Sequence, residues 1–236
     1  MDAKQECVGV DGARQGWLAV WEQGEELAWL VYDNPTALCS AHRHAAVIAV
    51  DIPIGLSDHG PRAPDVAARR FVGGKRASSV FSAPVRAIID SISQPEASRR
   101  HRAIDGRGFG AQAFAILPKI RIWDDLLVAD AELQARVYEI HPEVSFAALN
   151  GGIGLAHRKK SADGPAARMA LLGQEFGPER VRALVAACPR RLAATDDVLD
   201  ALVALWSAQR IASGVAVSLP SPPQMDSAGL RTAIHY

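Results

Sequence analysis

Short apolar runs separated by glycine residues open the chain, and they predict three β-strands joined by tight turns. The expected strands cover residues 7–10, 17–21 and 27–32. Because strands joined by such short turns run antiparallel, the pattern indicates a three-stranded meander. Asn34 and Pro35 come next, and they suit the N-cap and first position of a helix that extends to about His44.

Residues 45–50 are apolar at every position, which is typical of a strand that is buried on both faces in a parallel sheet. The run ends at Asp51, and Pro53 prevents its continuation because proline lacks the N–H group that a sheet requires. A further strand is expected at residues 136–140. Together the strands predict an α/β protein with a mixed five-stranded sheet, three strands antiparallel and two parallel, flanked by helices.

The other segments have helical or irregular patterns. Residues 57–110 are rich in proline, glycine, serine and arginine, with weak periodicity. A short helix is expected at 65–71 and a loop at 76–86, and Pro118 should interrupt a helix that begins at residue 111. Further helices are predicted at residues 121–130, 145–149, 164–172, 178–187 and 195–212, the last with Thr195 as N-cap, and residues 220–236 should form a proline-rich turn and a tail.

The length suits a single domain, residues 1–236, with an insertion at residues 57–135 after the fourth strand. No apolar run approaches the roughly 20 residues of a membrane span, and the first residues lack the apolar core of a secretory signal. The cysteines Cys7, Cys39 and Cys188 are too far apart for a disulfide framework or a metal-ligand spacing. We therefore expect a cytoplasmic protein with no membrane partner.

The formal net charge is zero, with 26 basic and 26 acidic residues, which by itself argues against a nucleic-acid partner. The charges are unevenly distributed along the chain, however. Residues 59–121 contain 12 basic and 4 acidic residues, an excess of eight positive charges that the rest of the chain balances. The insertion is therefore a basic segment in an otherwise acidic chain, and an overall charge of zero does not exclude a polyanionic substrate.

Two aspartates, Asp11 and Asp51, each follow a predicted strand. Ligands of open α/β sheets bind beyond the carboxyl ends of the strands, so these carboxylates would face one crevice if the two strands are neighbours. The alternative is that each aspartate only begins a turn.

The last predicted helix carries three more aspartates. With about 100° per residue, Asp200 lies at the edge of the apolar face, and Asp197 lies about 60° farther round. Both can point along the sheet edge while the helix packs. Asp196 and Asp197 are alternatively explained as first-turn acids that the helix dipole favours, an explanation that fits Asp200 less well.

Glu139, His141 and Glu143 form a polar run at the end of the fifth strand. Strand alternation would place all three on one face, although Pro142 limits how far the strand can extend. The alternatives are a solvated loop and, for His141, a hydrogen-bonded structural role.

Carboxylates that converge from two strand ends and a helix repel one another, and cations can relieve this repulsion. Mg²⁺ and Mn²⁺ are the natural occupants of an all-oxygen site. Two such ions in one site support the hydrolysis of phosphodiester bonds.

Six blocks of the chain resemble a family of predicted nucleases with an RNase H-like fold, long classed as a domain of unknown function. The blocks cover residues 7–20, 49–56, 78–86, 118–120, 139–146 and 196–202. The resemblance implies a core of three antiparallel strands, a helix, and two parallel strands with helices. It also implies, from the RuvC-like branch of that superfamily, two Mg²⁺ or Mn²⁺ ions held by the carboxylates of Asp11, Asp51, Asp197 and Asp200.

Glu143 lies in one of these blocks, and we assign it as an auxiliary ligand or general base, with Glu139 and His141 as auxiliary residues. The chain also departs from the superfamily pattern. RNase H itself has a glutamate on its first helix, whereas the helix expected at residues 35–44 contains no acid. The insertion is also larger than the usual connection between the fourth and fifth strands.

The basic insertion contains a candidate phosphate-binding loop, because two basic residues precede two serines there. Backbone amides and hydroxyls of such a loop can approach a phosphate, and basic residues beside a carboxylate site would hold a polyanionic backbone. The expected phosphate-binding residues are Lys75, Arg76, Ser78, Ser79, Arg86 and Lys119. The alternative is a solvated arginine-rich surface that pairs with Asp124, Asp125 and Asp130.

The sequence therefore predicts a metal-dependent nuclease acting on DNA or RNA. One alternative is a nucleotide- or phosphometabolite-handling enzyme, since Asp11-Gly12 is near the opening motif of actin-like kinases. Such kinases need two copies of the domain and glycine-rich phosphate turns, which argues against this alternative. Another is a non-catalytic nucleic-acid-binding protein, and the sequence leaves a homodimer open.

Overall fold

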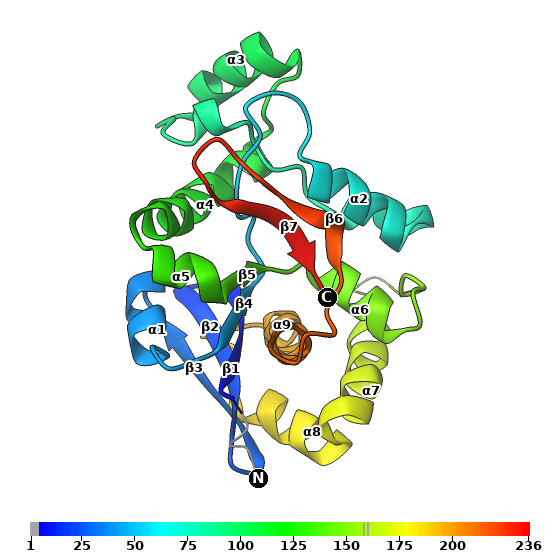
Figure 1. Ribbon diagram of the computed structural model, residues 1–236. Helices are drawn as coiled ribbons and strands as arrows, with labels where there is room; N and C mark the ends of the chain where they lie inside the picture. The colour runs from blue at the N-terminus through cyan, green and yellow to red at the C-terminus, as the bar shows by residue number, and fades with distance from the viewer. Residues whose placement is uncertain (1–4, 158, 160) are drawn as a thin grey trace.

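The computed structural model describes residues 5–157, 159 and 161–236, and a five-stranded mixed sheet lies at its centre (Figure 1). The strand order is β3-β2-β1-β4-β5, in which β2 pairs antiparallel with both β1 and β3, and β4 pairs parallel with both β1 and β5. The predicted α/β class and the mixed sheet are confirmed, and the arrangement is compatible with an RNase H-like fold. The strands of this sheet are β1 (Cys7–Ala13), β2 (Gly16–Gln23), β3 (Glu26–Tyr32), β4 (Val47–Val50) and β5 (Val137–Glu139).

Helices cover both faces of the sheet and build most of the insertion (Figure 1). The helices are α1 (Pro35–Ala41), α2 (Ala63–Val72), α3 (Gln94–Asp105), α4 (Ala111–Ala129), α5 (Ala131–Arg136), α6 (Pro142–Leu149), α7 (Gly164–Phe176), α8 (Pro178–Ala187) and α9 (Thr195–Ala212). Two short 3₁₀ helices, η1 (Gly74–Ser79) and η2 (Arg86–Ile88), lie in the insertion. None of the helices in the described part of the chain combines the length and apolar character that a bilayer crossing needs.

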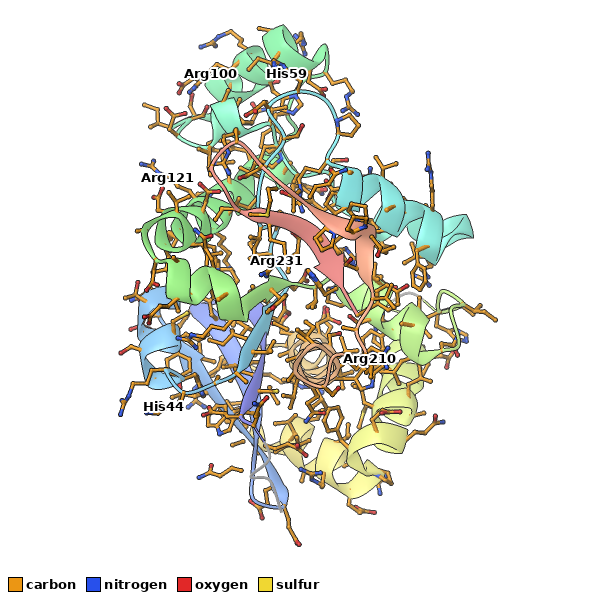
Figure 2. All side chains as sticks on the ribbon, viewed as in Figure 1. His44, His59, Arg100, Arg121, Arg210 and Arg231 are labelled. Atoms are coloured by element: carbon orange, nitrogen blue, oxygen red, sulfur yellow. The ribbon has the colours of Figure 1, made fainter. Side chains whose placement is uncertain are left out.

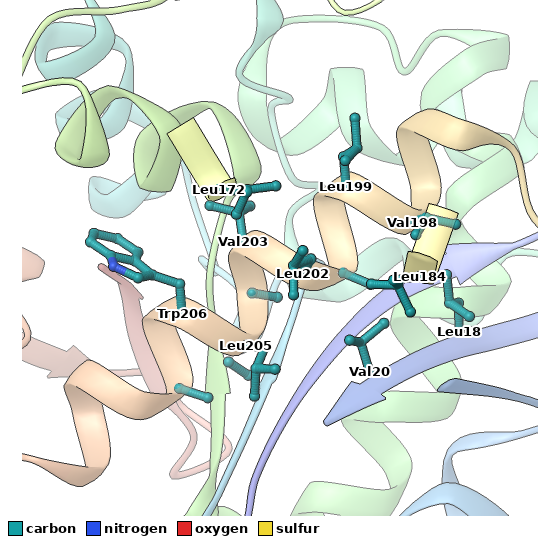
Figure 3. Packing of buried hydrophobic residues seen from close by; sticks show 14 of the residues in the cluster. Leu18, Val20, Leu172, Leu184, Val198, Leu199, Leu202, Val203, Leu205 and Trp206 are labelled. Atoms are coloured by element: carbon teal, nitrogen blue, oxygen red, sulfur yellow. The ribbon is translucent and has the colours of Figure 1, made fainter. Parts of the chain in front are cut away.

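The side chains of β2 alternate between two hydrophobic cores, one on each face of the sheet. Leu18 and Val20 point toward α9, which packs between the sheet and the helices α7 and α8 (Figure 3). Trp17 points to the opposite face, where its ring meets that of Trp123 from α4 edge-on at 5.4 Å. The strict alternation of the strand thus fixes which helices lie on which face.

Helix α9 crosses β1 in direct backbone contact at Gly9. A Cβ atom at this position would lie 2.1 Å from the carbonyl oxygen of Ala201 and from the amide nitrogen of Leu205. Only glycine permits this approach, because any side chain would overlap with helix backbone. As a result, the middle of α9 is held against β1.

Proline does not interrupt α4, so the expectation of a break at Pro118 was wrong. The helix continues from residue 111 to 129 with Pro118 on its exposed side, while Leu117 and Ile120 are buried. Water can reach the carbonyl group that loses its N–H partner there, which reduces the cost of a proline inside a helix.

The last segment is a β-hairpin and not the tail that the sequence pattern predicted. It consists of β6 (Ser218–Met225) and β7 (Arg231–His235), packs on α2 and β5, and buries Leu230 and Ile234 (Figure 1). Its prolines lie on β6, whose other edge has no strand partner among the described residues, so their missing N–H groups disturb no second ladder.

Candidate functional site

The parallel pairing of β1 and β4 ends at Val10 and Val50, and an aspartate follows each of them. The N–H of Asp51 donates a hydrogen bond to the carbonyl oxygen of Val10 at 3.0 Å, so the backbone of β4 is still next to that of β1 at Asp51. Pairing with β2 extends β1 to Ala13, which places Asp11 inside the strand and corrects the expectation that it ends the strand. The two strands are neighbours, and their aspartates therefore start from adjacent positions.

Asp200 reaches the same place from the first turns of α9. Its side chain is 2% exposed, and its Oδ2 accepts a hydrogen bond from Lys159 Nζ at 3.0 Å. Its Oδ1 is buried without a hydrogen-bond partner among the described residues. A buried carboxylate oxygen without a partner is costly, so it marks a position where a ligand would be stabilised.

Burial raises the pKa of all three carboxyl groups, and repulsion by neighbouring carboxylates adds to it. Burial is the largest cause at Asp11, whose pKa is well above the ordinary value, and the charges of Asp51 and Asp200 add to it. Burial together with the Asp200 charge raises the pKa of Asp51 to about 8. Burial raises the pKa of Asp200 to about 6, against the opposing charge of Lys159. The cluster therefore contains more negative charge than its surroundings compensate.

Among the described residues, Lys159 contacts the cluster directly with a positive charge. Its Nζ lies 3.0 Å from Asp200 Oδ2 and 3.8 Å from Asp196 Oδ2. Burial alone would lower the pKa of Lys159, but the charges of Asp200, Asp11 and Asp51 raise it, so the ammonium group stays protonated. The ammonium group of Lys159 thus faces more than one carboxylate.

Asp197 has a capping role in addition to its place near the cluster. Its Oδ2 accepts a hydrogen bond from the N–H of Ala194 at 2.8 Å, and burial raises its pKa. Ala194, and not Thr195 as expected, is the N-cap residue of α9. Asp197 is therefore a first-turn acid that stabilises the start of α9 through Oδ2.

A cavity of about 610 Å³ opens beside Asp51 and Asp200. Its walls come from the segment after β4, from η1 and the residues that follow it, from α4, from the start of α6 and from β7. The polar residues along it are Asp51, Asp65, Arg76, Ser78, Ser79, Glu139, His141, Glu143, Lys159 and Asp200. The volume is within the range of about 300–1,000 Å³ that is usual for small-molecule sites.

Glu139 lines the cavity, but its carboxylate is engaged in a buried network. Oε2 accepts hydrogen bonds from the N–H of Ile54 at 2.8 Å and from Arg62 Nη2 at 2.6 Å. Both Glu139 and Arg62 are buried. These hydrogen bonds fix the backbone that follows Asp51. Glu139 therefore helps to position the segment that carries Asp51.

Glu143 and His141 lie at the start of α6, with Arg168 of α7 behind them. Glu143 Oε1 accepts a hydrogen bond from Arg168 Nη2 at 2.6 Å, and both residues are buried. His141 is the N-cap residue, whose Nδ1 accepts a hydrogen bond from the N–H of Glu143 at 3.2 Å. Burial lowers the pKa of His141 to about 4, aided by the charge of Lys159, so the imidazole is neutral.

The candidate phosphate-binding loop forms η1, and some of its residues line the cavity. Ser78 and Ser79 line the cavity. Arg76 also lines it, but its Nε and Nη2 donate to the carbonyl oxygens of Leu155 and Ala156 at 2.6 and 3.0 Å. Arg76 therefore anchors the segment that leads to Lys159. The side chain of Lys75 lies outside the described residues.

Arg86 and Lys119 do not line this cavity. Arg86 forms a two-pronged ion pair with Asp124, both distances 2.9 Å, and a further ion pair with Asp226 of the hairpin. Lys119 donates to the carbonyl oxygen of Ala13 at 3.2 Å and lies 5.1 Å from the centre of the Trp17 ring. The structure thus gives both side chains partners within the protein.

Part of the insertion's positive charge is paired with acids of the insertion itself. Arg100 contacts Asp90 at 2.8 Å, and Arg121 contacts Asp125 at 3.6 Å. Figure 2 shows Arg100 and Arg121 on the outside of the insertion, away from α9. The predicted alternative, in which basic residues pair with Asp124, Asp125 and Asp130, therefore describes Arg86 and Arg121, whereas Asp130 caps α5.

Sequence reasoning missed three basic residues of the site: Lys159, Arg62 and Arg168. Lys159 belongs to a run of basic residues that begins at His157, and this run was a usable signal. The buried partners of Glu139 and Glu143 had no local signal, because Arg62 and Arg168 lie far from them in the sequence and meet them only in the folded chain.

The donor chemistry of Asp11, Asp51 and Asp200 fits a hard divalent cation. The three groups are carboxylates, Asp200 Oδ1 is buried and unpartnered, and their mutual repulsion would be relieved by positive charge. Within the described ranges, no three acidic, histidine or cysteine side chains are grouped closely enough to hold an ion as they stand. Binding would therefore require carboxylates to turn toward one another and Lys159 to move away from Asp200.

These features define a class: an α/β protein with an RNase H-like strand order and an acidic cavity at the ends of its central parallel strands. The family described as Protein of unknown function (DUF429) matches residues 9–225, and the chain belongs to this family. This agrees with the resemblance found in the six sequence blocks. Neither a curated protein nor a solved structure matches the chain significantly.

Proposed function

We propose that the protein is a divalent-metal-dependent nuclease that hydrolyses phosphodiester bonds at Asp11, Asp51 and Asp200. The observation that carries the proposal is the buried, unpartnered Oδ1 of Asp200, which lines a cavity together with Asp51 and lies near the buried Asp11. Mg²⁺ or Mn²⁺ bound there would neutralise the carboxylates and stabilise negative charge on a reacting phosphate. Nucleic acid is the proposed substrate, either DNA or RNA.

The chain's own residues have separate tasks in this proposal. Asp51 and Asp200 orient the attacking water, whose oxygen forms the new bond to phosphorus while the bridging P–O bond breaks. The water loses one proton to solvent, and the leaving oxygen takes one up from solvent. Lys159, which lines the cavity beside Asp200, pairs with a phosphate oxygen. Glu143 is held by Arg168 and serves as an auxiliary residue.

The first experiment compares Asp51→Asn with the unchanged protein in thermal unfolding, with and without Mn²⁺. Ligand at about a hundred times its Kd stabilises by about 2.7 kcal/mol, which corresponds to a rise of about 5–10 °C in Tm for a chain of this size. We expect this rise in the unchanged protein and its loss in Asp51→Asn. Asp125→Asn, an exposed acid on α4, is the matched control and should keep the full response.

The second experiment measures hydrolysis of labelled branched, single-stranded and DNA–RNA hybrid oligonucleotides in Mn²⁺. Asp51→Asn should lower the rate about 100-fold or more, because the charge that holds the ions is removed. Cleavage of none of the substrates, together with no Mn²⁺-dependent change in Tm, would contradict the proposal.

A nucleotide-handling enzyme is the second candidate, and the volume of the cavity favours it. The space of about 610 Å³ suits a single nucleotide as well as one unit of a polymer. Calorimetric titration with ATP separates the two functions: tight binding without oligonucleotide hydrolysis supports the second candidate. A non-catalytic binding protein would show the same cellular effect with Asp11→Asn as without it.

We also propose a cytoplasmic location. Cys7, Cys39 and Cys188 are all free and buried, as expected in a reducing compartment. Fractionation of cells that express the tagged chain tests this proposal.

A further inference from the structure

The cavity is lined by apolar residues as well as by carboxylates, and these apolar residues are called its apolar wall. The apolar residues that line it are Ile52, Pro53, Val80, Phe81, Ile116, Ile140, Pro142 and Ile234. Metal-dependent hydrolysis of a phosphodiester bond does not by itself require such a wall. The wall therefore points to a part of the substrate other than its phosphate.

This wall is built into the fold and is not a loose surface. Ile52 and Ile234 are 4% and 1% exposed. Phe81 and Ile116 are half-buried, and both pack against the hydrophobic core on the α4 side of the sheet. Since the wall residues come from five separate segments that the core holds together, the wall keeps its shape without a ligand.

The acidic and apolar sides meet within two consecutive residues. Asp51 contributes its carboxylate to the acidic cluster, and Ile52 begins the apolar wall. A ligand in the cavity would thus have a negatively charged group and an apolar, flat group only a few bonds apart. A nucleotide has this combination, with the phosphate and the base on either side of one sugar.

A base that is paired and stacked in a duplex cannot enter such a cavity, because its faces and its edge are covered. An unpaired base can be extruded, and an aromatic side chain such as Phe81 then offers a surface for stacking. Lys159 completes the arrangement, since it lines the cavity on the acidic side and can pair with the phosphate.

We propose that the cavity binds one unpaired nucleotide, with its base against Phe81 and Ile116 and its phosphate beside Asp51, Asp200 and Lys159. This inference rests on the proposed nuclease function and adds a substrate class to it. The enzyme would act on single strands, loops or mispaired positions of DNA or RNA, and would spare fully paired duplexes.

The test is a double-mutant cycle between Phe81 and the base. Hydrolysis in Mn²⁺ is measured for single-stranded and fully paired oligonucleotides, in DNA and RNA arms. Each single strand is made intact and with one abasic nucleotide at the mapped cleavage position. We expect Phe81→Ala to lower kcat/KM on intact single strands at least about fivefold, the lower limit for a lost stacking contact, and to have no effect on abasic strands.

Phe114→Ala is the matched control. Phe114 is also half-buried in the insertion, but it packs in a separate apolar cluster and does not line the cavity. It should leave the preference for intact over abasic strands unchanged. Phe81→Leu, which keeps most of the apolar volume, serves if Phe81→Ala unfolds in a thermal scan.

Affinity for the same oligonucleotides in Ca²⁺, measured by fluorescence anisotropy, provides a second readout. An equal effect of Phe81→Ala on intact and abasic strands, or equal hydrolysis of duplexes and single strands, overturns the inference while the nuclease function stands. If no oligonucleotide is hydrolysed, the proposed function fails, and the binding cycle in Ca²⁺ alone decides whether the base-binding wall exists. Absence of both hydrolysis and binding overturns both.

Discussion

Gly9 of β1 lies directly against Ala201 of α9, at a separation that leaves no room for a Cβ atom. Asp11 is two residues farther along the strand, and Asp200 precedes Ala201 on the helix. The contact therefore sets how closely the carboxylates from the strand and the helix approach. The close packing of Gly9 against Ala201 thus determines both how the core is packed and how strongly the carboxylates of the candidate site repel one another.

Gly9→Ala should destabilise the protein strongly, because the new Cβ atom would lie 2.1 Å from helix backbone that cannot move as a flexible side chain could. We expect a loss at or above the upper end of the range of about 1–3 kcal/mol for overpacked positions. Urea unfolding measures it. Gly110→Ala is the control, since nothing lies within 4 Å of its added Cβ atom, and its unfolding midpoint should hardly change. Similar losses in both variants would contradict the close crossing.

The metal-free protein should become less stable as the pH rises from about 5.5 to about 8.5. Burial raises the pKa of Asp51 to about 8, whereas the carboxyl group in the unfolded chain titrates near its ordinary value of about 3.9. Between these values the folded state binds more protons than the unfolded state, so deprotonation at high pH costs stability. Thermal unfolding in a chelator should show the fall in Tm.

Asp51→Asn provides the comparison for this pH dependence. The neutral amide has no proton to lose, so the variant should show a shallower fall in Tm and should exceed the unchanged protein at about pH 8.5. Parallel profiles for the two proteins would show that Asp51 is not the group responsible.

Lys159→Met should destabilise the metal-free protein at neutral pH, because Asp200 and Asp196 lose their nearest positive charge. The Lys159 side chain is 42% exposed, so solvent screening limits the loss to about 1 kcal/mol, or about 2–4 °C in Tm. Mn²⁺ should reduce the difference, since the ion replaces the missing charge. Lys159→Arg keeps the charge and should behave like the unchanged protein. A deficit of the same size with and without Mn²⁺ would separate Lys159 from the metal site.

Arg62→Met should cost about 3–5 kcal/mol, because Glu139 would be left buried without its partner. The double variant Arg62→Met with Glu139→Gln removes both charges and should recover much of this loss. Urea unfolding of the single and double variants gives the coupling energy directly. Arg182→Met, which breaks an exposed pair with Glu179 on α8, should change stability by no more than about 0.5 kcal/mol. Additive losses at Arg62 and Glu139 would contradict a coupled pair.

The sheet and the last long helix could be predicted from the sequence because they depend on local patterns. Residues 195–212 form α9 with the bounds that the apolar periodicity indicated. The helix α3 was missed because few of its residues are buried and its surface is highly charged, although Ser93 and Gly106 mark its ends. The hairpin was missed because prolines in β6 argue against a strand, and only its packing on α2 and β5 stabilises it.

The acidic half of the site could be proposed from the sequence, since Asp11 and Asp51 each follow a short apolar run and Asp200 lies beside the apolar face of a helix. The basic half could not. Arg86 and Lys119 were expected at a phosphate, but the structure pairs them with Asp124 and with the backbone of Ala13. Tertiary contacts decide which basic side chain faces the cavity. One example is Arg76, which anchors the segment that leads to Lys159, and a local sequence pattern does not reveal such a contact.

The cavity unites residues from Asp51 to Ile234, since Ile234 of β7 forms part of its wall and Asp200 of α9 forms part of its acidic side. During translation Asp11 and Asp51 leave the ribosome early, long before either of these partners exists. The pocket is therefore complete only once β7 has folded against α2 and β5. Any activity that depends on this cavity requires this late segment of the chain as well as the early carboxylates.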